Sequence, residues 1–284
     1  MKMDVFDARP CSLGEGPLWH PGRGALYWFN INASKLLGPG GAEWGFDEMV
    51  SAAGWIDDTT LLVASETQLM TFDLETGARA HVCDLEADNP ATRSNDGRAD
   101  PFGGFWIGTM GKRGEDGIGA FYRYYKGELR QLMGGISVSN GCCFSPDGTT
   151  AYLADTRKGQ IWRWRLDPAD GWPVAAPEVF CDPKADGFKP DGAVVDQDGV
   201  LWNAQYGGGR VAAYGPDGQF LRAISLDAPQ ATCPAFGGPD LRTLYCTSAH
   251  QGMGTDSLEK HPLSGQTFVL DDVAPGQAEH QVIL

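Results

Sequence analysis

Short stretches in which apolar and polar side chains alternate recur along the whole chain. Three clear examples are QIWRWRLDP from Gln160, RVAAYGPDGQF from Arg210 and AFYRYY from Ala120. A period of two, with many aromatic and β-branched residues, is typical of half-buried β-strands. Asp-Gly pairs separate several of these stretches and are frequent in the tight turns of β-hairpins. No amphipathic helix of useful length is visible, so the pattern predicts an all-β chain.

One longer phrase repeats at a coarser spacing. It consists of a polar residue, a glycine, an apolar strand, a turn, and a second strand with an aromatic residue near its end. Clear copies begin at Glu15, Asn95, Asn140 and Asp191, and weaker ones at Ala53 and Thr232. Repeats of roughly 40 to 50 residues are expected when each unit is a four-stranded blade of a β-propeller. The sequence therefore predicts a six-bladed β-propeller with four-stranded antiparallel blades.

Six units in 284 residues fit one closed ring, because closure removes the exposed edges of an open array. We expect a single propeller domain spanning residues 1–284. The N-terminal VFDAR and the late TFVLDD are predicted to share the closing blade.

Composition narrows the function classes. The formal net charge is −15 and the 22 Lys and Arg residues form no basic stripe, which excludes a nucleic-acid-binding role. No segment is apolar enough for a secretory signal or a membrane span. The seven cysteines are odd in number and contain no CxxC pair, so neither a disulfide framework nor a zinc site is indicated. We expect a cytoplasmic protein that makes no contact with membranes and is a monomer or weak oligomer.

The polar residue before each repeating glycine is a candidate metal ligand. Equivalent positions in a propeller ring the central channel, and four of these residues carry side-chain oxygens: Glu15, Asp96, Asn140 and Asp191. Such an oxygen-rich set suits Ca²⁺, Mg²⁺ or Mn²⁺, and it leaves zinc and iron open. The alternative is that Asp-Gly and Asn-Gly pairs only form turns. Spacing alone leaves both interpretations open.

Four motifs together resemble the SMP-30/gluconolactonase/regucalcin family. They are GEGPLWHPGRGALYWFNI, RSNDGRADPFGGFWIGTM, SNGCCFSPDGTTAYLADT and PDGAVVDQDGVLWNAQYGGGRV, and the resemblance runs from about residue 12 to about residue 255. It implies a six-bladed propeller with one divalent metal ion, whose bacterial members commonly hydrolyse aldonolactones.

The resemblance also implies roles for individual residues. Glu15 and Asn140 would be metal ligands, and Asp191 would be both a ligand and the general base. Arg93 and Asn95 would face the substrate. Repeat register points to Asp96 instead of Asn95, but a β-bulge could shift the register by one residue, so Asn95 is preferred.

A further acidic residue in the family precedes a G-A-[LF]-Y strand. In this chain GAFY begins at Gly119, which suggests Glu115 as a substrate-binding residue.

The predicted function is metal-dependent hydrolysis of a sugar lactone. Ca, Zn, Mg, Mn and Fe all remain candidates for the ion. No GxSxG nucleophile motif is present, and among the histidines only His250 is kept as a possible substrate contact. Two alternatives stay open: a non-catalytic metal-binding propeller, and a propeller hydrolase for another ester or a phosphotriester.

Overall fold

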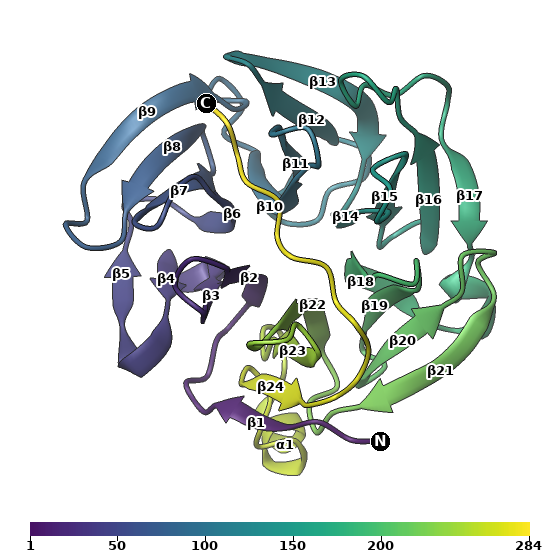
Figure 1. Cartoon of the computed structure of the whole chain (residues 1–284). Helices are drawn as coiled ribbons and strands as arrows, with labels where there is room; N and C mark the ends of the chain where they lie inside the picture. Colours follow the sequence, from purple (N-terminus) through teal and green to yellow (C-terminus); the bar gives the residue numbers. More distant parts are fainter.

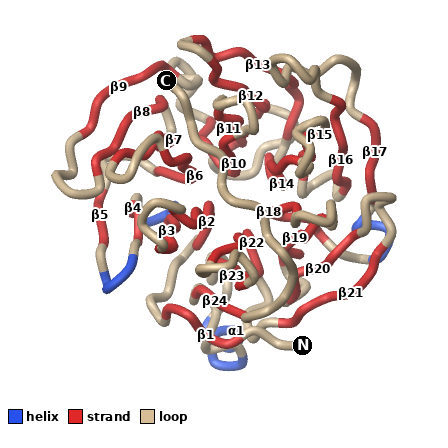
Figure 2. The backbone as a smooth tube through the Cα atoms, in the orientation of Figure 1, coloured by secondary structure: helices blue, strands red, loops and turns tan.

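Six four-stranded antiparallel sheets form a ring around a central channel in the computed structural model, which describes residues 1–284 (Figure 1). This confirms the predicted six-bladed β-propeller. The tube in Figure 2 shows how little of the chain is helical: three single-turn 3-10 helices and one short α-helix lie in the loops. They are η1 (Ile31–Ala33), η2 (Pro39–Gly41), η3 (Pro183–Asp186) and α1 (Thr255–Lys260).

In five blades the four strands follow one another along the chain from the innermost to the outermost. In the sixth blade the three inner strands come from the end of the chain and the outermost strand comes from the N-terminus. Blade 1 contains β2 (Gly14–His20), β3 (Ala25–Asn30), β4 (Lys35–Leu37) and β5 (Glu43–Gly45). Blade 2 contains β6 (Val50–Trp55), β7 (Thr60–Ser65), β8 (Gln68–Asp73) and β9 (Arg79–Asp84). Blade 3 contains β10 (Thr92–Ala99), β11 (Phe105–Gly111), β12 (Gly119–Tyr125) and β13 (Glu128–Ile136).

The second half of the ring follows the same order. Blade 4 contains β14 (Ser139–Phe144), β15 (Thr150–Asp155), β16 (Gln160–Arg165) and β17 (Glu178–Cys181). Blade 5 contains β18 (Lys189–Val195), β19 (Leu201–Tyr206), β20 (Arg210–Tyr214) and β21 (Phe220–Ser225). Blade 6 contains β22 (Ala231–Gly237), β23 (Thr243–Ser248), β24 (Thr267–Leu270) and β1 (Asp4–Asp7).

The two ends of the propeller sequence close the ring within blade 6. Strand β1 pairs antiparallel with β24, with Val5 opposite Phe268 and Asp4 opposite Val269. This confirms the prediction that VFDAR and TFVLDD share the closing blade. Closure of this kind supplies hydrogen-bond partners to a strand that would otherwise be an open edge.

The apolar core is divided among the six blade interfaces. Each of six buried clusters joins two neighbouring blades; the one between blades 3 and 4, for example, packs Trp106 and Phe121 against Phe144 and Trp164. The alternating aromatic residues of the sequence therefore mainly pack blade against blade. Removing this apolar area from water is the main favourable contribution to holding the ring together.

Some of the repeated acidic residues have a structural role. Asp196, after β18, accepts hydrogen bonds from the backbone N–H of Asp198 and Val200 and from Trp202 Nε1 at 2.8 Å. Asp100, after β10, likewise accepts hydrogen bonds from the backbone N–H of Phe102 and Gly104 and from Trp106 Nε1 at 3.0 Å. These carboxylates fix the turn between the first two strands and satisfy the indole N–H that the blade interface buries.

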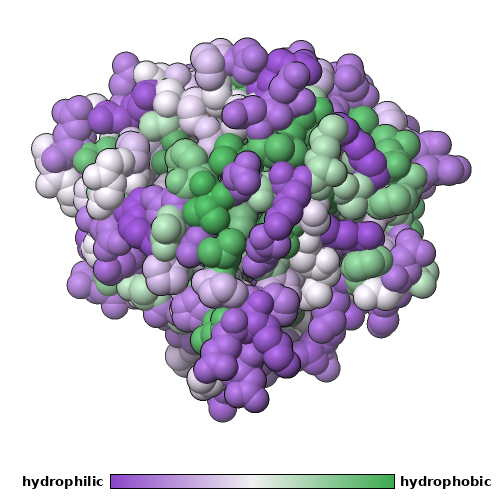
Figure 3. Space-filling model, turned by 90° about the horizontal axis from the view of Figure 1, so that it is seen from below, coloured by the Kyte–Doolittle hydropathy of each residue, from purple (hydrophilic) through white to green (hydrophobic).

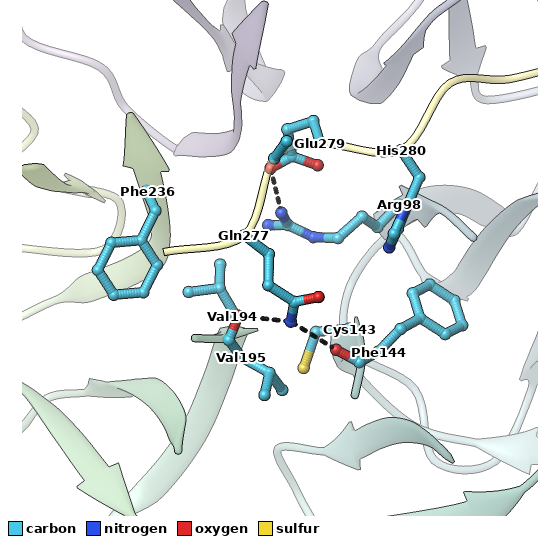
Figure 4. Close-up of a pocket in the computed structure, with 10 residues that line it drawn as sticks. Arg98, Cys143, Phe144, Val194, Val195, Phe236, Gln277, Glu279 and His280 are labelled. Carbon is cyan, nitrogen blue, oxygen red and sulfur yellow. Dashed lines mark hydrogen bonds and ion pairs between the residues drawn. The ribbon is translucent and has the colours of Figure 1, made fainter. Parts of the chain in front are cut away.

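Residues 275–284, called the strap below, cross one end of the channel. Figure 1 shows this yellow segment running over the middle of the ring from β24 to the opposite side. In Figure 4 its Glu279 meets Arg98 and its Gln277 points between blades 4 and 5. Gln277 Nε2 donates to the carbonyl oxygens of Phe144 (3.1 Å) and Val195 (2.8 Å). A cavity of only about 30 Å³ remains beneath the strap, so this end of the channel is closed.

The rim of the ring is mostly hydrophilic. Figure 3 views the molecule from the lower edge of Figure 1 and shows a hydrophilic surface with a band of hydrophobic residues across its middle. Strand β1 lies at this edge and leaves Val5 and Phe6 partly exposed. No helix is long and apolar enough to cross a membrane.

Candidate functional site

A β-bulge interrupts the first half of the inner strands and shapes the end of the channel opposite the strap. In β2, Glu15 pairs with Phe29 and the next pair is Leu18 with Tyr27. The extra residue turns the strand locally and redirects its side chains. Gly16 in this bulge has φ +52°, and a Cβ there would lie 2.2 Å from the Ser51 carbonyl oxygen. Only glycine fits, which explains why the residue after Glu15 is glycine.

Strand β14 repeats this arrangement. Asn140 pairs with Ala154 and the next pair is Cys143 with Tyr152, so Asn140 occupies the position of Glu15. Gly141 follows with φ +67°, again in the left-handed region that glycine adopts without strain.

Relative to the glycine, the same bulge begins one residue earlier in β18 and two residues earlier in β10. In β18 the paired residues flanking the bulge are Pro190 and Ala193, which makes Asp191 its first residue. In β10 they are Ser94 and Gly97, which makes Asn95 its first residue. By strand pairing, Asn95 is therefore the blade 3 equivalent of Asp191. Counting back one residue from the glycine had given Asp96 as the equivalent instead. The bulge expected from the sequence is present.

Asp96 contacts the inner strand of blade 4 and does not line the cavity described below. Its Oδ2 accepts a hydrogen bond from the backbone N–H of Cys142 at 2.8 Å, and the side chain is buried between the inner strands. Asn95 instead lies at the surface of a cavity. The oxygen-bearing position of blade 3 in that cavity is therefore Asn95.

A cavity of about 590 Å³ opens at this end of the channel. Small-molecule sites commonly have volumes of about 300–1,000 Å³. Five of the six residues predicted as site residues line it: Glu15, Arg93, Asn95, Asn140 and Asp191. All five side chains are buried. Inner strands of four different blades thus bring together residues that lie far apart in the sequence.

Glu115 does not line this cavity. It lies in the loop between β11 and β12, where its Oε2 accepts a hydrogen bond from the backbone N–H of Arg113 at 3.0 Å. Its assignment as a substrate-binding residue stays a prediction without support from this geometry. His250 also lies elsewhere, in a shallow pocket beside α1, while its neighbour Gln251 lines the main cavity.

A chain of hydrogen bonds fixes the polar side chains of the cavity. Arg93 Nη1 donates to Asn95 Oδ1 at 2.7 Å, and Asn95 Nδ2 donates to Asn140 Oδ1 at 3.1 Å. Asn140 Nδ2 donates to Thr156 Oγ1 at 2.7 Å, and Thr156 Oγ1 in turn donates to the Pro190 carbonyl oxygen at 2.7 Å. Because each amide donates to a fixed acceptor, this network determines which way the Asn140 carbonyl oxygen points.

The two carboxylates carry negative charge that the protein compensates only in part. Burial raises the pKa of Asp191 well above its ordinary value, and the neighbouring Glu15 raises it further. The pKa of Glu15 is raised as well, first by burial and then by Asp96. Arg93 is the cationic partner at the site, and burial lowers its own pKa to about 10. Glu15 accepts one hydrogen bond, from the Gly16 N–H at 3.2 Å.

This donor set fits a hard divalent cation. Carboxylate and amide oxygens are the ligands that Ca²⁺, Mg²⁺ and Mn²⁺ prefer, and neither His nor Cys lines the cavity. The chain contains no group of three or more His, Cys, Asp or Glu side chains placed to hold a metal. A metal centre here would therefore need the Asn140 oxygen beside Glu15 and Asp191. A cation would also neutralise the two buried carboxylates, which are costly when unpaired.

Sequence reasoning missed several residues of the cavity. They are Leu13, Met110, Val138, Thr156, Arg157, Gly159, Lys184, Gly187, Phe188, Lys189, Tyr206 and Gln251. Two of them could have been found from topology: Thr156 follows β15 and Tyr206 ends β19. In an antiparallel hairpin the end of the second strand returns to the beginning of the first. Residues from the longer loops carried no such signal.

Comparison with known proteins gives one consistent result. Residues 13–250 match the model of the SMP-30/gluconolactonase/LRE-like region family. A protein of Rhizobium meliloti named "putative sugar lactone lactonase" is 39% identical over 94% of this chain and 92% of its own length. A "6-deoxy-6-sulfogluconolactonase" of Pseudomonas putida is 36% identical, covering 95% of each chain.

Among solved structures, a protein of Agrobacterium tumefaciens described as a calcium-binding protein, regucalcin, superposes with a TM-score of 0.97. It is 38% identical, and the match covers 100% of this chain and 98% of that one. The region matched by the family model contains all six blades except β1 and β24 of the closing blade, and it includes every residue of the cavity apart from Gln251. The chain belongs to the SMP-30/gluconolactonase family.

Proposed function

We propose that this protein hydrolyses a sugar lactone to the corresponding aldonic acid. One observation carries the proposal: two buried carboxylates, a fixed amide oxygen and a buried arginine line one cavity of substrate size. The names of the two curated relatives, a sugar lactone lactonase and a sulfogluconolactonase, support the same reaction class. A lactone is a cyclic ester, so hydrolysis needs an activated water, a polarised carbonyl group and donors for the sugar hydroxyls.

Glu15, Asn140 and Asp191 are the residues that would hold one divalent metal ion. When bound there, such an ion supplies Lewis-acid polarisation of the carbonyl oxygen and lowers the pKa of bound water. The buried pair of carboxylates supports this assignment, because Arg93 alone offsets only part of their charge. The identity of the ion follows from the oxygen donors only as far as a preference for Ca²⁺, Mg²⁺ or Mn²⁺.

Asp191 is the proposed general base. Its carboxylate accepts a proton from the attacking water as the water oxygen forms a bond to the lactone carbonyl carbon. The ring C–O bond then breaks, and the ring oxygen leaves as a hydroxyl group by taking up the proton that Asp191 had accepted, which returns Asp191 to its carboxylate form. The Asp191 backbone is held for this role by Asn203 Nδ2, which donates to the Asp191 and Gly192 carbonyl oxygens at 2.9 and 3.0 Å.

Arg93 and Asn95 are proposed to orient the sugar. Only Nη1 of Arg93 is engaged within the protein, with Asn95 Oδ1 and the Ser94 carbonyl oxygen, so its remaining N–H groups are available to substrate oxygens. Donors fixed in this way lower the entropic cost of positioning the lactone.

A panel of substrates tests the reaction class. On protein loaded with a divalent metal, we expect the best five- or six-membered aldonolactone to have a kcat/KM at least about 100-fold above that of an apolar aryl ester or a phosphotriester. A site built from buried hydrogen-bonding groups discriminates strongly against analogues that leave those groups unpaired. Acid release in weak buffer measures the lactones, and released phenol measures the other esters.

The alternatives give different results in the same panel. Preference for the aryl ester or the phosphotriester would replace the lactonase proposal with another hydrolase. Folded, metal-loaded protein that turns over none of the substrates would favour a non-catalytic metal-binding role.

A further inference from the structure

The mouth of the main cavity carries positive charge that the proposed reaction does not use. Beyond Arg93, three cationic side chains line the cavity: Arg157, Lys184 and Lys189. The only carboxylates lining it are the buried Glu15 and Asp191. The chain as a whole has a formal net charge of −15, whereas the side chains that line this cavity carry more positive than negative charges. A surface whose charge only kept the protein soluble would not be expected to differ locally in sign.

Two of these cations have no partner in the protein. Neither Lys184 nor Lys189 forms an ion pair or donates a side-chain hydrogen bond, whereas Lys2, Lys35 and Lys112 each pair with a carboxylate. Arg157 differs from the two lysines, because it pairs with Asp116 at 2.8 Å. The mouth therefore presents two free ammonium groups.

Local structure holds these lysines at the cavity. Lys189 begins β18, two residues before Asp191, and its side chain lines the cavity. Lys184 lies in η3, whose first turn is capped by the Asp182 side chain. The Lys184 backbone N–H donates to the Gly159 carbonyl oxygen at 3.2 Å. The Lys184 side chain also packs closely on Gly159: a Cβ built on Gly159 would lie 2.4 Å from the Lys184 Cβ.

We propose that the substrate is a sugar lactone with an anionic group, a carboxylate or a sulfonate, at the end of the sugar remote from the lactone carbonyl. This inference rests on the proposed lactonase function. Glu15, Asp191, Arg93 and Asn95 lie in the inner strands and hold the reacting end of the sugar. Lys184 and Lys189 lie at the outer part of the same cavity and bind the anionic end. The cavity volume of about 590 Å³ leaves room for both ends of one molecule.

Paired substrates test the inference. We would measure kcat/KM at low salt for a neutral aldonolactone and for two analogues whose terminal CH2OH is replaced by carboxylate or by CH2–sulfonate. The expected preference for an anionic analogue is about tenfold, and it should fall as salt is raised to about 0.5 M, because exposed charges are screened. The carboxylate and sulfonate arms show which anion the site prefers.

Substitutions assign the preference to the two lysines. In the double variant Lys184→Gln, Lys189→Gln, the ratio of anionic to neutral kcat/KM is expected to fall to near one. Lys158→Gln is the matched control, since Lys158 directly precedes Gly159, on which Lys184 packs, but its ammonium lies over the Trp162 ring and the residue does not line the cavity. The control should keep the wild-type ratio.

The outcomes separate this inference from the function on which it rests. Equal or better turnover of the neutral lactone by the wild type, or an unchanged ratio in the double variant, overturns the anionic-substrate inference and leaves the lactonase proposal standing. Failure to hydrolyse any of the three lactones overturns both.

Discussion

Replacing Asp191 by asparagine is expected to lower kcat/KM for a sugar lactone by about 10³-fold. General-base catalysis contributes typically about 10²–10⁴-fold, and the same change removes a charged ligand from the proposed metal site. The backbone of the bulge should be retained, because Asn203 contacts carbonyl oxygens and not the Asp191 side chain. Steady-state acid release with wild-type and variant protein measures the effect.

The metal-free stability of this variant distinguishes lost chemistry from lost structure. The introduced asparagine has the same shape as the aspartate but no charge to repel Glu15, so the metal-free variant should unfold at a temperature no lower than the metal-free wild type. Asp198→Asn, at an exposed turn of the same blade, is the control and should keep wild-type activity. An Asp191→Asn variant that folds, binds metal and keeps more than about a tenth of the wild-type rate would contradict the base assignment.

Deleting the strap, residues 275–284, is expected to lower the melting temperature by about 10 °C. The deletion removes the Arg98–Glu279 ion pair, the two hydrogen bonds of Gln277 and the apolar contacts of the strap, a combined loss of about 3–5 kcal/mol. For a chain of this size each kcal/mol corresponds to roughly 2–4 °C. Val282, which is 1% exposed and packs on the cluster between blades 2 and 3, is lost as well. Differential scanning calorimetry measures the change.

Activity should respond differently from stability in this experiment. The strap closes the end of the channel opposite the main cavity, so the truncated protein should hydrolyse lactone at 25 °C within about twofold of the wild type. Glu279→Gln isolates the ion pair and should account for much of the loss, with the exposed Glu259→Gln as its control. An unchanged melting temperature after truncation would show that the strap does not stabilise the ring.

The fold could be predicted from the sequence because every blade is built from the same pattern of strands and turns. Alternating strands, Asp-Gly turns and a glycine in each inner strand specify one blade, and six copies specify the ring. The pairing of β1 with β24 could be predicted too, since a strand-like segment at each end of the sequence had no other partner. The strap could not be placed from the sequence. Residues 275–284 contain no strand-like alternation, and their one turn signal, Pro275-Gly276, does not show that the segment after it crosses the channel. The strap binds through its backbone, through single polar side chains and through the buried Val282.

The sequence predicted those residues of the candidate site that belong to the repeated motif or to the family motifs. Glu15, Asn140 and Asp191 stand before glycines and were found together, and the family resemblance found Arg93 and Asn95. The choice between Asn95 and Asp96 depended on a one-residue bulge that residue types do not encode. Lys184 and Gln251 come from loops between strands, where the sequence does not show which side chains return to the channel.

The most direct test of this account is the rate of aldonolactone hydrolysis by metal-stripped protein before and after a divalent metal is added back. Ca²⁺, Mg²⁺, Mn²⁺, Zn²⁺ and Fe²⁺ would be tried in turn, with Asp191→Asn treated in the same way. The account predicts that the stripped wild type is nearly inactive, that at least one metal restores its turnover, and that no metal restores the variant. Full activity of the stripped wild type, or no activity with any metal from folded protein, would contradict it.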